Sequence, residues 1–125
     1  MVKASVKLVF AAALLCVALG AQAAQPYSAK AFQDAQAAGK GILINVYAPW
    51  CPVCKVQRPI IQSFEKSNPQ LTAFEVDFDK AKDVLKKFGV RYQSTLIVFK
   101  GKNEVGRSTG ETAPAAITDL LEKGL

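Results

Sequence analysis

The side chains best suited to chemistry in this sequence are two cysteines three residues apart, Cys51 and Cys54. They follow an apolar, β-prone segment over residues 42–48, and Pro52 lies between them. Proline is well accommodated in the first turn of a helix, where its missing N–H has no partner to lose. We therefore expect a strand over residues 42–48 followed by a helix over residues 51–66, with Cys51 at the helix N-terminus.

This placement predicts thiol chemistry. Unpaired N–H groups and the positive end of the helix dipole favour a thiolate at Cys51, so its pKa should lie below the free value of about 8.5. Cys54, one turn later and nearer the core, should stay protonated longer. An exposed Cys51 would attack a substrate disulfide, and Cys54 would then attack the mixed disulfide and release the reduced substrate. The same steps in reverse would oxidise a dithiol.

Two other uses of such a cysteine pair must be weighed. The pair could be half of a zinc site, but the chain has no histidine and only one further cysteine, Cys16. These residues cannot complete a four-ligand Cys/His site within one chain. The pair could also be an inert structural disulfide, which its position at a helix start beside Trp50 argues against. The lack of histidine also excludes catalysis by a Cys–His or Ser–His pair within the chain.

The first 23 residues have the pattern of a secretory signal peptide. Lys3 and Lys7 form a basic start, and an uninterrupted apolar run follows over residues 8–18. Residues 21–23 read Ala-Gln-Ala, which fits cleavage after Ala23. The apolar run is shorter than the roughly 20 residues that span a bilayer. We therefore predict an exported, periplasmic protein with no stable membrane insertion after cleavage.

The remaining residues, 24–125, fit one globular domain. The whole chain has 125 residues, of which 50% are hydrophobic and 21% are charged. Cleavage would remove Cys16 and leave Cys51 and Cys54 as the only cysteines, in a compartment where disulfides persist. Basic residues are scattered among acidic ones, so the net charge of +6 does not indicate nucleic-acid binding.

Hydrophobic periodicity and turn residues predict alternating helices and strands in the mature chain. Helices are expected over 28–38, 51–66, 80–88 and 113–123, and strands over 42–48, 71–78, 95–100 and 104–109. Strands joined through helices run parallel by right-handed crossovers, whereas the last two form an antiparallel hairpin. The expected fold is an α/β three-layer sandwich with a four-stranded mixed sheet.

Several details of these elements can also be predicted. Asp79 should cap the third helix. The second helix should turn Val56, Ile60, Ile61 and Phe64 towards the core. Six phenylalanines should be core residues: Phe32, Phe64, Phe74, Phe78, Phe88 and Phe99. Pro49, Trp50 and Tyr92 either form an apolar rim for an extended peptide or serve only in packing.

Residues 50–55 read Trp-Cys-Pro-Val-Cys-Lys directly after an apolar strand, which resembles the active site of the thioredoxin family. Pro59 matches the proline of the family's active-site helix. Gly110 matches the glycine that lines its peptide groove. The resemblance covers nearly all of residues 28–124.

The resemblance implies a thioredoxin fold and a thiol–disulfide oxidoreductase that acts on protein thiols and disulfides without a cofactor. Its catalytic residues would be Cys51 and Cys54. Supporting or substrate-binding positions would be Trp50, Pro52, Val53, Lys55, Asn45, Glu75, Gln93, Ser94 and Gly110.

The sequence departs from the family at the loop before the third strand. Ser94 stands where the family has a cis-proline. A cis bond before a non-proline residue costs roughly 2.5–4 kcal/mol, so we predict a trans Gln93–Ser94 bond. Ser94 could offer its hydroxyl to the thiolate. It could also open the site to a metal or iron–sulfur cluster held by Cys51 and Cys54 across a dimer, which is the alternative function.

A second departure concerns proton transfer. The family buries an aspartate where this chain has Asn45, and its accompanying lysine aligns with Glu75. A neutral amide cannot accept a proton from Cys54. One hypothesis is that Glu75 supplies the displaced carboxylate from the neighbouring strand; the alternative is that Glu75 faces solvent.

The residues between the cysteines bear on the redox potential. Pro52 and Val53 provide no imidazolium to hold the Cys51 thiolate, which favours a reducing or moderate potential over a strongly oxidising one. An exported reductant needs an electron donor, and we expect a membrane thiol reductant.

Overall fold

The computed structural model describes residues 24–125. The predicted signal peptide and Cys16 lie outside the described residues. Within residues 24–125, none of the helices has the length and apolar character needed to cross a membrane.

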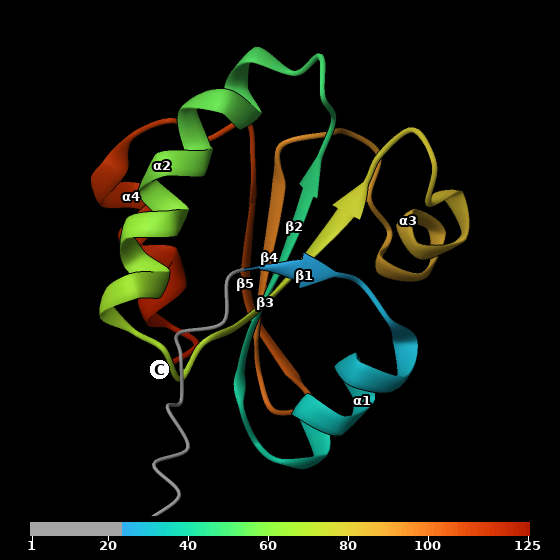
Figure 1. Cartoon of the computed structure of the whole chain (residues 1–125), viewed down its shortest axis with the longest axis vertical. Helices are drawn as coiled ribbons and strands as arrows, with labels where there is room; N and C mark the ends of the chain where they lie inside the picture. Colours follow the sequence, from blue (N-terminus) through green and yellow to red (C-terminus); the bar gives the residue numbers. More distant parts are fainter. Residues whose placement is uncertain (1–23) are drawn as a thin grey trace, which may run out of the picture.

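The described chain forms a mixed sheet with helices on both faces (Figure 1). Its elements are β1 (Gln25–Pro26), α1 (Ala29–Ala37), β2 (Gly41–Tyr47), α2 (Pro52–Ser67), β3 (Thr72–Asp77), α3 (Lys82–Phe88), β4 (Thr95–Lys100), β5 (Asn103–Thr109) and α4 (Pro114–Glu122). The strand order is β1-β3-β2-β4-β5. The β1–β3 and β2–β3 pairs are parallel, and the β2–β4 and β4–β5 pairs are antiparallel.

The four expected strands are all present, but the sheet has a fifth. The short β1 pairs with the outer edge of β3, where Gln25 is the partner of Phe74. The backbone N–H of Tyr27 extends this pairing by donating to the Glu75 carbonyl at 2.9 Å. Pro26 lacks a backbone donor, which is tolerated at a sheet edge. A pairing of only two residues leaves no alternating pattern in the sequence, so this strand was not predicted.

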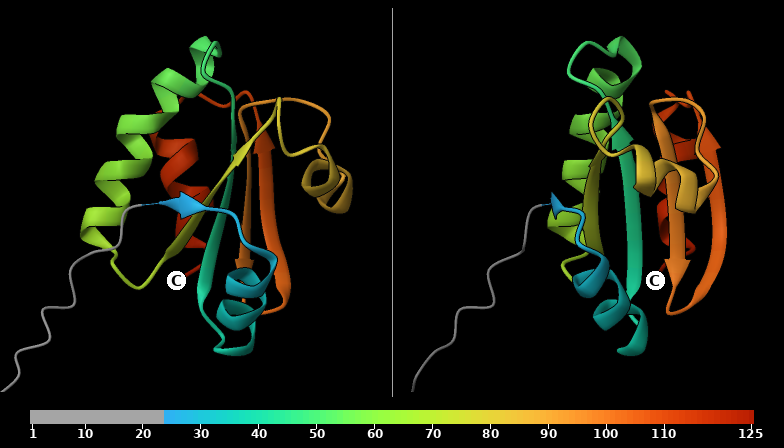
Figure 2. Two further views of the ribbon diagram at one scale, coloured as in Figure 1. Left: turned by 45° about the vertical axis from the view of Figure 1, so that its right-hand side comes forward. Right: turned by 90° about the vertical axis from the view of Figure 1, so that its right-hand side faces the viewer.

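Helices α1 and α3 cover one face of the sheet, and α2 and α4 cover the other (Figures 1 and 2). Side chains of a strand alternate between these two layers. In β2, Ile44 joins the core beneath α1 and α3, whereas Leu43 joins the core beneath α2 and α4. Burial on both faces explains why β2 and β4 are almost continuously apolar.

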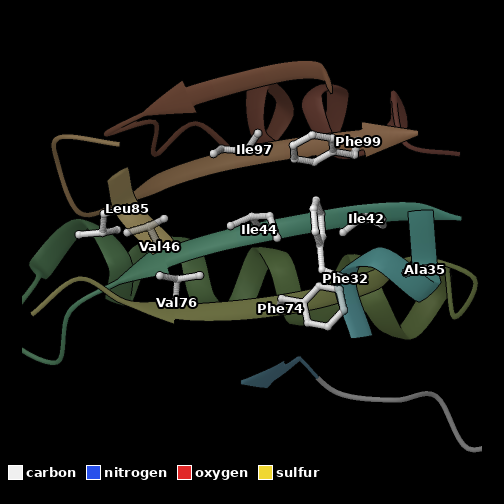
Figure 3. Close-up of a cluster of buried hydrophobic side chains, with 10 residues drawn as sticks. All are labelled: Phe32, Ala35, Ile42, Ile44, Val46, Phe74, Val76, Leu85, Ile97 and Phe99. Atoms are coloured by element: carbon white, nitrogen blue, oxygen red, sulfur yellow. The ribbon is translucent and has the colours of Figure 1, made fainter. Parts of the chain in front are cut away.

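The first of these cores is rich in aromatic residues, as Figure 3 shows around Phe32. The Phe32 ring packs edge-on against Phe74, Phe88 and Phe99, with centroid separations of 6.3, 5.4 and 5.3 Å. Phe32, Phe64, Phe74 and Phe99 are buried, whereas Phe78 and Phe88 are partly buried and pack against the cores.

Different local features set the two ends of α3, and its start contradicts a prediction from the sequence. Gly89 ends α3 in the left-handed conformation, with φ 65°, as glycine readily does. Asp79 was predicted to cap α3, but the residue before this helix is Ala81, which makes no side-chain capping bond. The Asp77 carboxylate accepts the N–H groups of Asp79 and Lys80. This local turn delays the start of α3 to Lys82.

The buried stripe of α2 also differs from the prediction. Val56 is 48% exposed, whereas Gln57 is only 1% exposed. The stripe starts at Cys54 and continues through Gln57, Ile61 and Phe64 at helical spacing. The prediction used only the apolar residues to locate the buried face of α2, and it therefore chose Val56 instead of Gln57. Ile60 is half-buried and packs against the second core.

Candidate active site

Cys51 and Cys54 form a disulfide where β2 leads into α2. Their Cα atoms are 5.3 Å apart. Cys51 is the N-cap of α2, and its Sγ accepts the backbone N–H of Cys54 at 3.1 Å. The helix N-terminus predicted for Cys51 is therefore confirmed. On reduction, the same N–H and the helix dipole favour a thiolate on this sulfur.

Both cysteines are buried in the disulfide state. Cys51 is 0% exposed and Cys54 is 7% exposed. They pack with Ala48, and the partly buried side chains of Tyr47, Val53 and Phe78 pack against them. The exposure expected for Cys51 is therefore absent in this oxidised form, because its Sγ is turned back onto the first turn of α2.

Two aromatic side chains are exposed, one directly before Cys51 and one in the loop before β4. Trp50 is 56% exposed and Tyr92 is 65% exposed. The Trp50 Nε1–H donates to the Asp79 carboxylate at 2.8 Å. Sequence reasoning missed this role of Asp79, since the two residues are 29 positions apart and no motif joins them.

The remaining motif residues occupy the first turn of α2. Pro52 is the first residue of the helix, which agrees with its predicted place in the first turn, and it is exposed. Val53 is half-buried against the disulfide, and Lys55 is exposed. These positions place Lys55 at the surface beside the redox pair.

Ser94 lies at the same end of the sheet as the cysteines. The Gln93–Ser94 bond is trans, as predicted, because the described chain contains no cis peptide bond. Ser94 is 4% exposed and has φ 59°, a left-handed conformation that non-glycine residues seldom adopt. Its hydroxyl donates to the Gln93 carbonyl in the oxidised protein.

Backbone hydrogen bonds tie Ser94 to its neighbours in the sheet. Its N–H donates to the Val46 carbonyl at 2.8 Å, and its carbonyl accepts the Gly110 N–H at 3.1 Å. Val46 is near the end of β2 that leads to Cys51, and it pairs with Thr95. The topology thus brings Ser94 and Gly110 together with the end of β2.

Asn45 and Glu75 lie side by side on the face covered by α2. They are direct partners in the parallel β2–β3 pairing. Arg58 Nη1, on α2, is 3.7 Å from Glu75 Oε1, and the Glu75 side chain is only 26% exposed. Glu75 therefore does not extend freely into solvent. It shares a polar cavity of about 260 Å³ with Asn45, Arg58 and Gln62.

Glu65 also lines this cavity, and sequence reasoning did not single it out. It is 7% exposed, and its Oε1 has no hydrogen-bond partner among the described residues. Burial raises the pKa of Glu65, a hydrogen bond from the Ala24 backbone partly opposes the rise, and the charge of Glu75 adds to it. The cavity therefore holds two carboxyl groups and one arginine.

The alternative function would require ligands for a metal ion or cluster. Within residues 24–125, there is no group of three or more His, Cys, Asp or Glu residues placed to hold a metal ion.

The sequence is similar to those of a known protein family. The sequence profile of the thioredoxin family, described as Thioredoxin, matches residues 23–123. Thioredoxin-1 of Saccharomyces cerevisiae is 37% identical over 94 residues, which cover 75% of this chain and 90% of the yeast protein. The chain belongs to the thioredoxin family.

Solved structures agree with this assignment. The crystal structure of Trxlp from Edwardsiella tarda has a TM-score of 0.76 and 46% identity, covering 79% of this chain and 98% of that one. A mutant thioredoxin from Halobacterium salinarum, 21% identical with a TM-score of 0.72, is similar in fold. It covers 83% of this chain and 91% of that one.

Family membership and the Cys51–Cys54 disulfide together define the activity. The protein is a thiol–disulfide oxidoreductase with a thioredoxin fold. Thioredoxins act on protein disulfides, so disulfide exchange with proteins is the chemistry that the site must serve.

Proposed function

We propose that Cys51 is the nucleophile and Cys54 the resolving thiol of an exported enzyme that reduces protein disulfides. The main support is the position of Cys51 at the α2 N-cap, with the Cys54 N–H 3.1 Å from its sulfur. That sulfur would carry the negative charge most easily in the reduced enzyme.

In the proposed reaction, the Cys51 thiolate attacks one sulfur of the substrate disulfide. A Cys51–substrate bond forms, the substrate S–S bond breaks, and the other substrate sulfur leaves as a thiolate. Cys54 then loses its proton and attacks Cys51 Sγ, which expels the second substrate thiolate. Two electrons pass to the substrate, which takes up two protons, and the Cys51–Cys54 disulfide is left behind.

Glu75 is the proposed acceptor of the Cys54 proton. Asn45 cannot accept a proton as the family's aspartate does, whereas Glu75 lies beside it and faces α2. Arg58 is close enough to hold this carboxylate in place.

The enzyme must be reduced again after each cycle. Pro52 and Val53 add no cation beside Cys51, which supports a reducing or moderate potential. The proposed donor is a membrane thiol reductant whose own dithiol becomes a disulfide. The leader pattern of residues 1–23 supports export to the periplasm.

A dithiothreitol-driven insulin turbidity assay tests the reaction. The wild-type protein should accelerate precipitation, whereas Cys51→Ser should abolish the effect. Cys54→Ser should accumulate a mixed disulfide that non-reducing electrophoresis separates. If Cys54→Ser traps nothing while Cys51→Ser remains active, the assigned roles are wrong.

Three further measurements address the potential, the compartment and the metal alternative. Equilibration with glutathione gives the potential, and a value as oxidising as that of DsbA, about −120 mV, would contradict a reducing role. Cell fractionation with mass analysis should find a periplasmic chain that begins at Ala24. Visible absorption and metal analysis of freshly purified protein would reveal a cluster, and a stoichiometric metal would favour the alternative.

A further inference from the structure

Gln57 is the polar side chain most deeply buried in α2. It is 1% exposed and occupies the stripe between Cys54 and Ile61 that faces the sheet. An amide is costly to bury unless it is hydrogen-bonded, so its partners identify its role.

Those partners come from two different loops. Gln57 Nε2 donates to the Ser94 carbonyl at 3.2 Å and to the Glu111 carbonyl at 2.9 Å. Both partners are acceptors, so the NH₂ group must face them. Gln57 Oε1 has no hydrogen-bond partner among the described residues. Both described hydrogen bonds of this side chain are therefore donated by its NH₂ group.

The two loops flank the β4–β5 hairpin in sequence and lie next to each other at the cysteine end of the sheet, where Thr95 pairs with Thr109 and the Gly110 N–H donates to the Ser94 carbonyl. Ser94 directly precedes β4, and Glu111 lies between β5 and α4. Glu111 is itself fixed, because its Oε1 accepts the N–H groups of Thr112 and Ala113 at 2.9 and 2.8 Å. Gln57 thus connects a rigid turn to the loop beside the redox pair.

Ser94 needs such a restraint. Its φ of 59° is unfavourable for a residue with a Cβ, so other contacts must maintain it. Val46 and Gly110 hold Ser94 to the sheet, and Gln57 holds it to α2. A proline ring would restrict this backbone covalently, and a serine does not.

We propose that Gln57 is a positioning residue that holds the Ser94 loop against the redox helix and thereby sets the shape of the substrate groove. This role rests on the proposed function, in which a protein disulfide approaches Cys51 past this loop. Without the Gln57 bonds, the Ser94 carbonyl loses its link to α2, and the loop can move relative to the cysteines. The loss should weaken binding of a protein substrate but leave the intrinsic reactivity of Cys51 intact.

The variant Gln57→Met tests this role. Methionine has a similar shape and lacks both donors, and it also removes the unpartnered oxygen. The KM for insulin or another protein disulfide should rise about tenfold, as expected for the loss of one or two neutral hydrogen bonds. The kcat, and the rate at which reduced Cys51 attacks a small aromatic disulfide, should stay within about twofold of wild type.

Gln33→Met is the matched control, since Gln33 is an exposed glutamine of α1, which covers the opposite face of the sheet from α2. Amide hydrogen exchange gives a second readout. The Gly110 amide, which donates to the Ser94 carbonyl, should exchange faster in Gln57→Met and not in Gln33→Met. If Gln57→Met fails to fold, Gln57→Asn retains an amide that is too short to reach both carbonyls, and it should raise KM in the same direction.

The outcomes separate this role from the proposed function. An unchanged KM and unchanged Gly110 exchange in a folded Gln57 variant would overturn the positioning role. An equal loss of activity towards protein and small disulfides would overturn it as well, because the effect would then lie in Cys51 itself. A wild-type protein that fails to reduce insulin would instead refute the proposed function.

Discussion

Asn45 and Glu75 are direct partners in the parallel pairing of β2 and β3, and both line the polar cavity beneath α2. An amide and a carboxylate thus occupy neighbouring positions behind the helix that carries the cysteines. Arg58 reaches the same cavity, with its Nη1 3.7 Å from Glu75 Oε1 and its guanidinium over the Tyr47 ring at 5.8 Å. This arrangement gives the Glu75 hypothesis a structural basis.

Replacing Glu75 tests proton transfer. In Glu75→Gln, resolution of the mixed disulfide by Cys54 should slow at least about tenfold near neutral pH, since general-base assistance is typically worth more than that. The loss should shrink as rising pH deprotonates Cys54 without help. Stopped-flow measurement with a preformed mixed disulfide isolates this step, and Asp83→Asn on the exposed part of α3 is the control. An unchanged rate and pH profile would exclude the role.

The bond between Trp50 and Asp79 predicts a specificity effect. Asp79→Ala removes the acceptor of the Trp50 indole N–H and should free the exposed ring. The KM for protein disulfides should rise about threefold, in line with one partly exposed hydrogen bond. Fluorescence anisotropy of the single tryptophan should fall. Asp79→Asn keeps an acceptor oxygen and should behave like wild type, so equal effects of both variants would count against the bond.

Local sequence signals were sufficient for most of the fold. The continuous apolar stretches of β2 and β4 indicate burial on both faces, and Ser28 caps α1 by accepting the Ala31 N–H. Pro52 marked the start of α2 and therefore the position of Cys51. These features depend on residues close together in the chain, and the family resemblance added the activity.

The parts that were missed depend on contacts distant in the sequence. Gln57 bonds to residues 37 and 54 positions away, so nothing in its own segment showed that it, rather than Val56, would be buried. Asp79 was predicted to cap α3 because it lies just before that helix in the sequence. Its actual partner, Trp50, is 29 positions away, so no local pattern indicates the bond. The β1 pairing uses only Gln25 and Pro26, too few residues for a strand pattern.

The left-handed backbone of Ser94 predicts which substitutions the loop tolerates. Ser94→Val places a β-branched side chain at φ 59° and should lower the free energy of unfolding by about 2 kcal/mol. Ser94→Gly keeps the same backbone hydrogen bonds without that strain and should stay within about 1 kcal/mol of wild type. Urea denaturation of both variants measures the difference. A valine variant as stable as the glycine variant would show that the loop does not hold Ser94 in this conformation.

Glu65 predicts a pH dependence of stability. Burial raises its pKa above the ordinary value of 4.5, so between 4.5 and the raised value the folded protein binds more protons than the unfolded chain. Stability contributed by protonated Glu65 is complete below pH 4.5 and is lost as pH rises through the folded pKa. Glu104, whose pKa is lowered by Arg107, acts in the opposite direction and is common to all variants compared.

Glu65→Gln should therefore be more stable than wild type at neutral pH, and its advantage should vanish as pH falls below 4.5. Urea midpoints measured across this range for wild type, Glu65→Gln and the exposed control Glu122→Gln isolate the effect. The Ala24 N–H stabilises the carboxylate form of Glu65. A chain that begins at Ala24 carries a charged amino group there, which stabilises this carboxylate further. The change in stability with pH should therefore be smaller in that chain than in one extended at its N-terminus. A Glu65→Gln curve parallel to wild type at every pH would mean that this carboxyl titrates alike in the folded and unfolded states.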